Sequence, residues 1–127
     1  SATDDRAAIK VRDARGCRLE NNTLLDTFFG IYLSRVSGCI VRGNRVRGHG
    51  VTEALTGNAI HSWSSSGLVI EDNVVRGHRD GIYFEFTSDA TVRGNTSGGQ
   101  LRYGLHFMFS NGCRYIGNTE RPSGELR

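Results

Sequence analysis

A fifteen-residue module recurs five times in this chain, and every copy ends on asparagine. The copies begin at residues 8, 30, 59, 81 and 104, so successive starts lie 22, 29, 22 and 23 residues apart. Such a period is typical of solenoids, in which each repeat forms one coil and buries its apolar face only by stacking on its neighbours. The repeat therefore restricts the chain to a stacked, quasi-linear fold.

Apolar and polar residues alternate inside each module, which is typical of a strand with one buried face. The second position is always Ile or Leu, and the fourth is apolar in four of the five copies. A second alternating segment follows in every copy. Gly, Ser, Asp and Asn stand between and after these segments, where they tolerate tight turns. The pattern predicts two strands per coil and no helix.

We therefore expect an all-β fold, a right-handed parallel β-helix of about five coils that each rise about 4.8 Å. Residues 1–127 are expected to form a single domain. The connector over residues 45–58 is seven residues longer than its counterparts, and we expect it to bulge as a loop beside the third coil. Because the chain starts without Met and ends partway into a coil, we expect an internal piece of a longer solenoid.

The asparagine that closes each module is predicted to be structural. A side-chain amide donates and accepts hydrogen bonds, so it can bond to its copies in the coils above and below. One outward column of the second strand alternates in sign through Glu20, Arg42, Glu71 and Arg93. Opposite charges on neighbouring coils favour the in-register stack over a shifted one.

Three cysteines share one inward position of the module and are expected to pack as small apolar side chains. Cys17 and Cys39 fall on adjacent coils and could approach within disulfide range, but their spacing does not establish a bond. Cys113 lies three coils from Cys39 and is expected to reach neither of them. The spacing of the cysteines does not predict a zinc site.

The chain carries 16 Lys and Arg against 13 Asp and Glu, a net charge of +3. The basic residues are spread over the coils rather than clustered, so the sequence predicts no nucleic-acid partner. Direct insertion into a membrane is not predicted either.

Two outward columns of the first strand concentrate the chemically active side chains. One column comprises Lys10, Tyr32, His61, Tyr83 and His106, and the other comprises Arg12, Ser34, Trp63, Glu85 and Met108. On the last three coils these columns are expected to place imidazole, indole, phenol, carboxylate and thioether groups on one exposed face. His106 and Met108 lie about 7 Å apart along their strand, and Glu85 is one coil away.

Imidazole and thioether ligands together suit Cu(I), and an indole face can hold a cation. His61, Glu85, His106 and Met108 are therefore candidate copper ligands. The alternative is an aromatic ladder that stabilises the sheet or binds a partner, because cross-strand aromatic pairs are common stabilisers.

Three stretches in the last three coils read GNAIHSW (57–63), GHRDGIYFEF (77–86) and LRYGLHFMFS (101–110). They resemble the NosD family, periplasmic β-helix proteins that help to mature the copper site of nitrous oxide reductase. The resemblance extends over about residues 57–118. The first two coils are similar to the family mainly through the repeat.

The resemblance implies a non-enzymatic accessory protein of the periplasm that handles copper or docks nitrous oxide reductase. Its other implied partners are an ABC-type ATPase and permease and a lipoprotein copper chaperone. Trp63 and Tyr83 would then belong to the docking face, while Arg79, Asp80 and Arg102 would shape its rim.

Two other functions are compatible with a β-helix. Polysaccharide lyases, hydrolases and epimerases need paired carboxylates, or a carboxylate-held cation and a base, on one face. Glu85 is the only carboxylate in the two outward columns, so we expect no enzyme. A purely structural or adhesive spike would show neither metal affinity nor sugar turnover.

Overall fold

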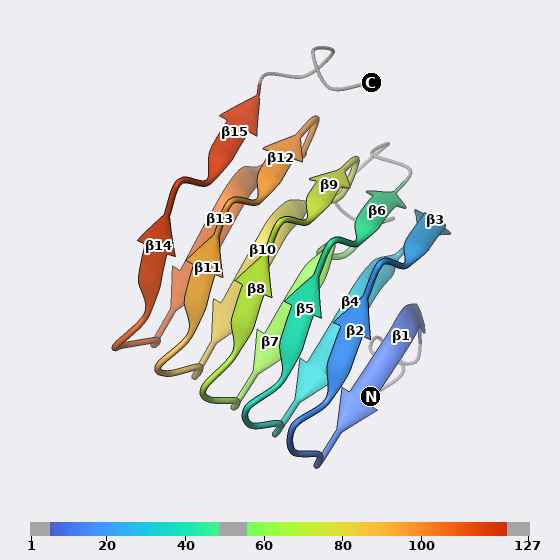
Figure 1. Cartoon of the computed structure of the whole chain (residues 1–127). Helices are drawn as coiled ribbons and strands as arrows, with labels where there is room; N and C mark the ends of the chain where they lie inside the picture. The colour runs from blue at the N-terminus through green and yellow to red at the C-terminus, as the bar shows by residue number, and fades with distance from the viewer. Residues whose placement is uncertain (1–5, 49–55, 122–127) are drawn as a thin grey trace.

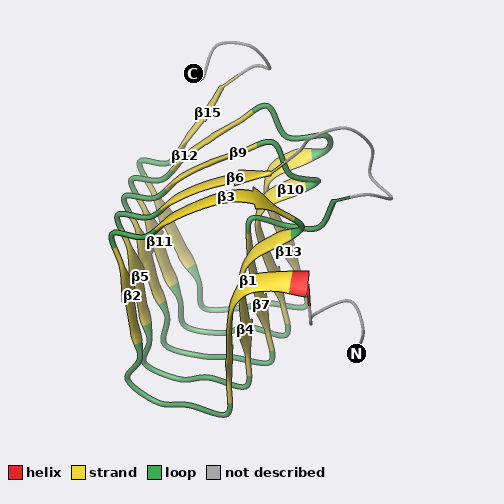
Figure 2. Cartoon of the chain, turned by 90° about the vertical axis from the view of Figure 1, so that its right-hand side faces the viewer, coloured by secondary structure: helices red, strands yellow, loops and turns green. Residues whose placement is uncertain are grey.

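The computed structural model describes residues 6–48 and 56–121. In this part of the chain the strands form three parallel sheets of five strands each, and the chain passes through the sheets in turn (Figure 1). Figure 2 shows the coils stacked one behind another around a common interior. The all-β parallel solenoid predicted from the repeat is confirmed.

The first sheet contains the longest strands and the two outward columns singled out above. Its members, in order of pairing, are β1 (Ala7–Arg12), β4 (Phe29–Ser34), β7 (Ile60–Trp63), β10 (Asp80–Glu85) and β13 (Tyr103–Met108). The register joins Lys10, Tyr32, His61, Tyr83 and His106, and it joins Arg12, Ser34, Trp63, Glu85 and Met108. Both columns therefore run as the repeat predicts.

The second sheet is formed by the second alternating segment of each module. It contains β2 (Arg18–Glu20), β5 (Ile40–Arg42), β8 (Val69–Glu71), β11 (Thr91–Arg93) and β14 (Arg114–Ile116). Every pairing in this sheet is parallel and in register.

A third sheet was not predicted, and the expectation of two strands per coil is wrong. It contains β3 (Thr23–Thr27), β6 (Arg45–Gly48), β9 (Val74–Arg76), β12 (Thr96–Gly98) and β15 (Thr119–Arg121). Its inward column changes from Leu24, Val46 and Val75 to Ser97 and Glu120, so the apolar signal fades along the chain. The long connector, predicted as a loop, therefore starts with a strand, and its residues 49–55 lie outside the described residues.

Buried aliphatic columns fill the space between the three sheets. Ile31, Ile60 and Ile82 stack on successive coils and are fully buried. Each such side chain contributes roughly 1.5–3 kcal/mol by leaving water. The small Ser62 replaces an apolar residue in the third coil, and its hydroxyl lies 3.0 Å from that of Thr87. This buried polar group is therefore hydrogen-bonded.

The asparagine ladder predicted from the repeat is confirmed. The side-chain oxygens of Asn44, Asn73, Asn95 and Asn118 each accept hydrogen bonds from the backbone N–H and the side-chain amide of the preceding asparagine, at 2.9–3.0 Å. The Nδ2 of Asn73 also donates to the Val41 carbonyl, 3.0 Å away. The ladder thus satisfies buried amides and joins all five coils.

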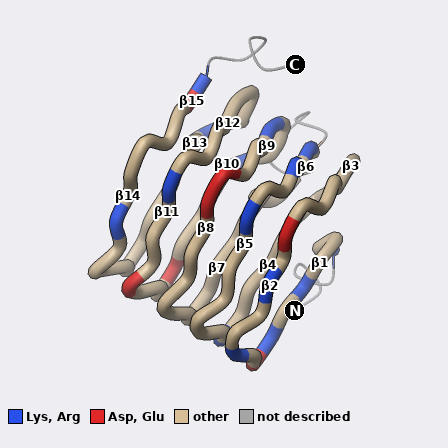
Figure 3. Tube along the Cα trace, viewed as in Figure 1, with Lys and Arg blue, Asp and Glu red and all other residues tan. Residues whose placement is uncertain are grey.

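The charge ladder on the second sheet is confirmed at its centre, but at the end formed by Glu20 the pairing differs from the prediction. Glu71 forms an ion pair with Arg42 at 2.8 Å and accepts a hydrogen bond from Arg93 at 2.5 Å. Glu20 pairs with Arg18 of its own strand, at 3.0 Å. Figure 3 shows the alternation of sign along β2, β5, β8 and β11. Hydrogen bonding to Arg93 lowers the pKa of Glu71 below its usual value, against the opposing effect of burial.

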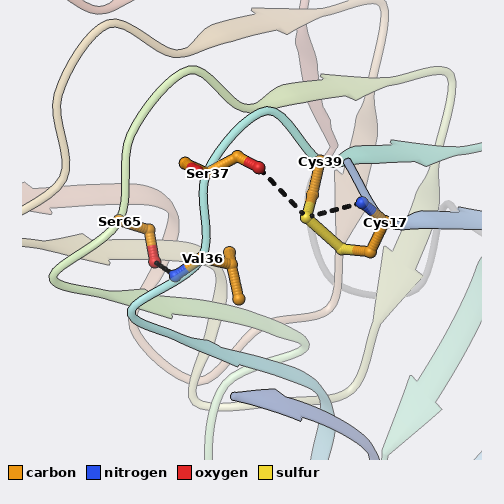
Figure 4. The surroundings of a disulfide bond; sticks show 5 residues. All are labelled: Cys17, Val36, Ser37, Cys39 and Ser65. Atoms are coloured by element: carbon orange, nitrogen blue, oxygen red, sulfur yellow. Dashed lines mark hydrogen bonds between the residues drawn. A yellow bond between two sulfur atoms is a disulfide. The ribbon is translucent and has the colours of Figure 1, made fainter. Parts of the chain in front are cut away.

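A disulfide joins the first two coils, which resolves the question that the spacing left open. Cys17 and Cys39 are bonded, with their Cα atoms 4.5 Å apart, and Figure 4 shows the bond beside the turn of the second coil. In the same turn the Val36 N–H donates to the Ser65 hydroxyl at 3.1 Å. Cys113 is free, as expected.

Each coil leaves the first sheet through a residue in the left-handed region of φ. These residues are Asp13, Arg35, Ser64, Phe86 and Phe109, with φ between 50° and 54°. The conformation costs an L-residue roughly 1–2 kcal/mol. The backbone N–H of the first four donates to a carbonyl of the next coil at 3.0–3.1 Å, which holds the turn in place.

The part of the chain described, residues 6–48 and 56–121, contains no helix with the length and apolar character needed to cross a membrane.

Candidate metal and docking site

A continuous stack of rings occupies the outward face of the first sheet. The Tyr32 and His61 rings are stacked with centroids 4.4 Å apart, and the Tyr83 ring follows 4.8 Å from His61. The Tyr83 and His106 rings then meet edge to face at 5.1 Å. Such aromatic pairs stabilise a fold by about 0.5–1.5 kcal/mol beyond their burial. The ring ladder that the sequence offered as an alternative is therefore present.

His61 lies inside this stack rather than on open surface. Its exposure is 9%, and the Phe29 ring packs edge-on against it at 5.3 Å. The buried Asn58 side chain donates from its amide nitrogen to Nδ1 of His61 at 3.0 Å. The side-chain oxygen of Asn58 accepts from the Asp80 N–H at 3.2 Å. The expectation that every member of the cluster faces solvent is therefore wrong for His61, because the neighbouring rings and Asn58 cover it.

Asp80 is also buried, although it was expected at the rim of the site. Its side chain is 1% exposed, and its two carboxylate oxygens have separate partners. Oδ1 accepts from the Tyr103 backbone N–H at 3.0 Å, and Oδ2 accepts from Nδ1–H of His106 at 2.9 Å. The first residue of β10 thus bonds to two residues of β13 and fixes the orientation of the His106 ring.

The contact with Asp80 decides which nitrogen of His106 is available. Nδ1 carries the proton that Asp80 accepts, so in the neutral ring Nε2 holds the lone pair. The His106 side chain is 24% exposed. A carboxylate that orients an imidazole in this way is the usual outer partner of a metal-binding histidine.

Met108 and Glu85 lie next to His106 in the register. Met108 is two residues along the same strand, and Glu85 is its partner on the neighbouring strand. The Tyr83 hydroxyl donates to the Met108 sulfur at 3.4 Å. Burial, and secondly the Glu85 carboxylate, raise the pKa of Tyr83 above its usual value. His106, Met108, Tyr83 and Glu85 thus form a patch of nitrogen, sulfur and oxygen donors.

Trp63 and the arginines lie around this patch. The guanidinium of Arg35 lies 5.9 Å from the centroid of the Trp63 ring, so a cation already occupies one side of the indole. The guanidinium of Arg102 lies 5.2 Å from the Tyr103 ring. Nε of Arg79 is buried without a hydrogen bond, although the Arg79 side chain as a whole is half-buried.

Two aromatic residues that were not singled out from the sequence stand beside Met108. Phe86 and Phe109 are 53% and 70% exposed, and their rings stack at 5.1 Å. Exposed aromatic side chains in contact with one another often mark protein interfaces. The repeat carried a signal for them, because both occupy the module position that holds Asp13, Arg35 and Ser64 in the other coils.

Within residues 6–48 and 56–121, no three His, Cys, Asp or Glu side chains lie together in a way that could hold a metal ion. A site on this face therefore depends on the thioether of Met108, which is a ligand for soft Cu(I).

The fold and the face described above place this chain in the class of parallel β-helix proteins. Its three parallel sheets wind into stacked coils, with an asparagine ladder and outward columns in register. The family model described as "Right handed beta helix region" matches residues 2–120, and the chain belongs to this family. No curated protein and no solved structure matches the chain significantly.

Proposed function

We propose that this β-helix is a non-catalytic accessory protein that handles Cu(I) and presents it to a docked partner at the patch formed by His106, Met108, Tyr83 and Glu85. The contact between Asp80 and His106 carries the proposal. A buried carboxylate that fixes an imidazole beside a thioether gives a preorganised pair of donors for a soft ion.

Copper is the cargo of this site. Nε2 of His106 and the sulfur of Met108 are the donors that suit Cu(I), and the half-buried Glu85 adds negative charge. His61 supports the patch from within, because its ring packs against Tyr83. The stacked pair of Phe86 and Phe109 provides an apolar border for a partner protein.

The motifs that resemble the NosD family include these residues, and they suggest the process in which the protein acts. We propose that it takes part in maturation of the copper site of nitrous oxide reductase, together with an ABC-type ATPase and permease and a lipoprotein copper chaperone. A periplasmic location is part of the proposal. The disulfide between Cys17 and Cys39 supports it, because such bonds persist in oxidising compartments.

The test is an anaerobic titration of the whole chain with Cu(I) against a competing chelator. We expect one Cu(I) per chain in the wild type and at least a tenfold loss of affinity for the double variant His106→Gln, Met108→Leu. Met108→Leu conserves volume and removes only the sulfur. The control Lys10→Gln, Arg12→Gln alters the same two columns in the first coil and should bind as the wild type does.

Asp80→Asn tests the positioning role of the carboxylate. We expect a loss of Cu(I) affinity of about tenfold, the lower end of the effect of outer partners of metal ligands. The nitrogen-15 shifts of the His106 ring should show the change in tautomer population. Failure of the folded wild type to compete for Cu(I), or unchanged affinity in the double variant, would refute a copper site on this face.

A further inference from the structure

An arginine-lined groove runs over the outward face of the third sheet, away from the ring stack. It encloses about 130 Å³, and its walls include Thr23, Leu25, Arg45, Arg47, Val74 and Arg76. No acidic residue belongs to the lining of this groove. Figure 3 shows the positive charge at β6 and β9.

The backbone brings the three guanidinium groups to one place. Arg47 and Arg76 are direct partners in the register of β6 and β9. Arg45 is two residues before Arg47 and therefore points to the same side of its strand. Within the described part of the chain, these three side chains take part in no ion pair or hydrogen bond. Three positive charges thus share a small groove, and no described residue of its lining supplies a counter-charge.

Like charges directly opposite each other destabilise a sheet. On the second sheet the same coils avoid this cost, because Glu71 lies between Arg42 and Arg93. On the third sheet the repulsion between Arg47 and Arg76 remains. A bound anion would remove it, and the planar guanidinium group is suited to bind two oxygens of such an anion at once.

We propose that this groove is a binding site for a phosphate or sulfate group, either free or carried by a larger ligand. Arg45, Arg47 and Arg76 supply the donors and the charge, and Thr23 lines the same groove. Leu25, which is 61% exposed, and Val74 offer an apolar wall for the organic part of a larger ligand. This site is independent of the proposed copper patch.

The probe is inorganic phosphate, titrated into the nitrogen-15-labelled chain with sodium chloride at matched ionic strength as the reference. We expect saturable shifts of the Nε–Hε and backbone signals of Arg45, Arg47 and Arg76. The double variant Arg47→Gln, Arg76→Gln should bind phosphate at least tenfold more weakly. Arg15→Gln, Arg114→Gln removes the same charge from exposed positions outside the groove and should bind within twofold of the wild type.

Phenyl phosphate forms the second arm of the experiment. Tighter binding of phenyl phosphate than of inorganic phosphate assigns the site to a group on a larger ligand, and equal binding assigns it to the free ion. Shifts that chloride reproduces, or equal weakening in both double variants, overturn the proposal, because they show a response to net charge alone. The amide spectra of the variants show whether each remains folded.

Discussion

Two ladders run along the same coils, and they differ in what surrounds them. The asparagine ladder is buried at its centre, with Asn44 and Asn73 fully enclosed. The charge ladder on the second sheet is partly exposed, because the Arg42 and Arg93 side chains keep 41% and 53% of their surface in solvent. Both ladders repeat once per coil and both are fully paired at Asn73 and Glu71.

The difference lies in what happens when one member is removed. A buried amide that loses its partner cannot form a replacement hydrogen bond with water, whereas an exposed guanidinium can. The asparagine ladder should therefore hold the coils together, while the charge ladder should mainly select the correct register.

The largest effect is expected for Asn73→Ala, at the centre of the buried ladder. This change removes four hydrogen bonds, to Asn44 twice, to Asn95 and to Val41, and leaves several buried groups unpaired. The free energy of unfolding should fall by about 3–5 kcal/mol. Urea denaturation followed by circular dichroism measures it.

Asn22→Ala is the matched control at the end of the ladder, where the side chain is half-buried and donates one bond to Asn44. It should cost about 1 kcal/mol. Equal losses for the two variants would contradict the view that burial gives the ladder its strength.

A smaller effect is expected when the disulfide between the first two coils is removed. Cys17 and Cys39 close a loop with a sequence separation of 22 residues, so Cys17→Ser, Cys39→Ser should lower the free energy of unfolding by about 3 kcal/mol. Denaturation with and without reductant gives the same comparison in the wild-type chain. Cys113→Ser, which removes no disulfide, should leave the response to reductant unchanged. A response that persists in the double variant would show that the disulfide between Cys17 and Cys39 is not its cause.

The smallest effect is expected for Glu71→Gln in the charge ladder, about 0.5–1 kcal/mol at pH 7. The pKa of Glu71 is lowered in the folded chain, so its contribution is present above its ordinary value of 4.5 and disappears as the pH falls. The stability difference between wild type and variant should therefore shrink below about pH 4.5. Urea midpoints measured between pH 3 and pH 7 test this, with Glu20→Gln as a control outside the paired centre. A difference that stays constant with pH would show that Glu71 acts through packing alone.

Most of the fold could be predicted because identical positions recur in every coil. The asparagine that ends each module and the apolar second position each give five copies of the same signal. The third sheet gave no such signal, since its inward residues range from Leu24 to Glu120. The last strand, β15, has no apolar inward residue of its own, and it is found only by its register with β12.

The candidate site could be predicted only in part. The repeat places His106, Met108 and Glu85 in neighbouring columns, and the register confirms that placement. The contact between Asp80 and His106 could not be predicted, because Asp80 stands outside the module and its side chain bonds to a residue three positions further along the register of the next strand. The burial of His61 likewise depends on Asn58, which belongs to the long connector.

The left-handed corner residues separate the shape of this scaffold from its surface chemistry. An aspartate, an arginine, a serine and two phenylalanines occupy equivalent corners with nearly the same φ, so the backbone there does not depend on the side chain it carries. Selection can therefore change the charge or the apolar character of this edge one coil at a time without altering the path of the chain. In this molecule the edge is ionic at the first two coils, where Asp13 pairs with Arg35, and aromatic at the last two, where Phe86 stacks on Phe109. One backbone path thus presents two chemically different surfaces along a single edge of the solenoid.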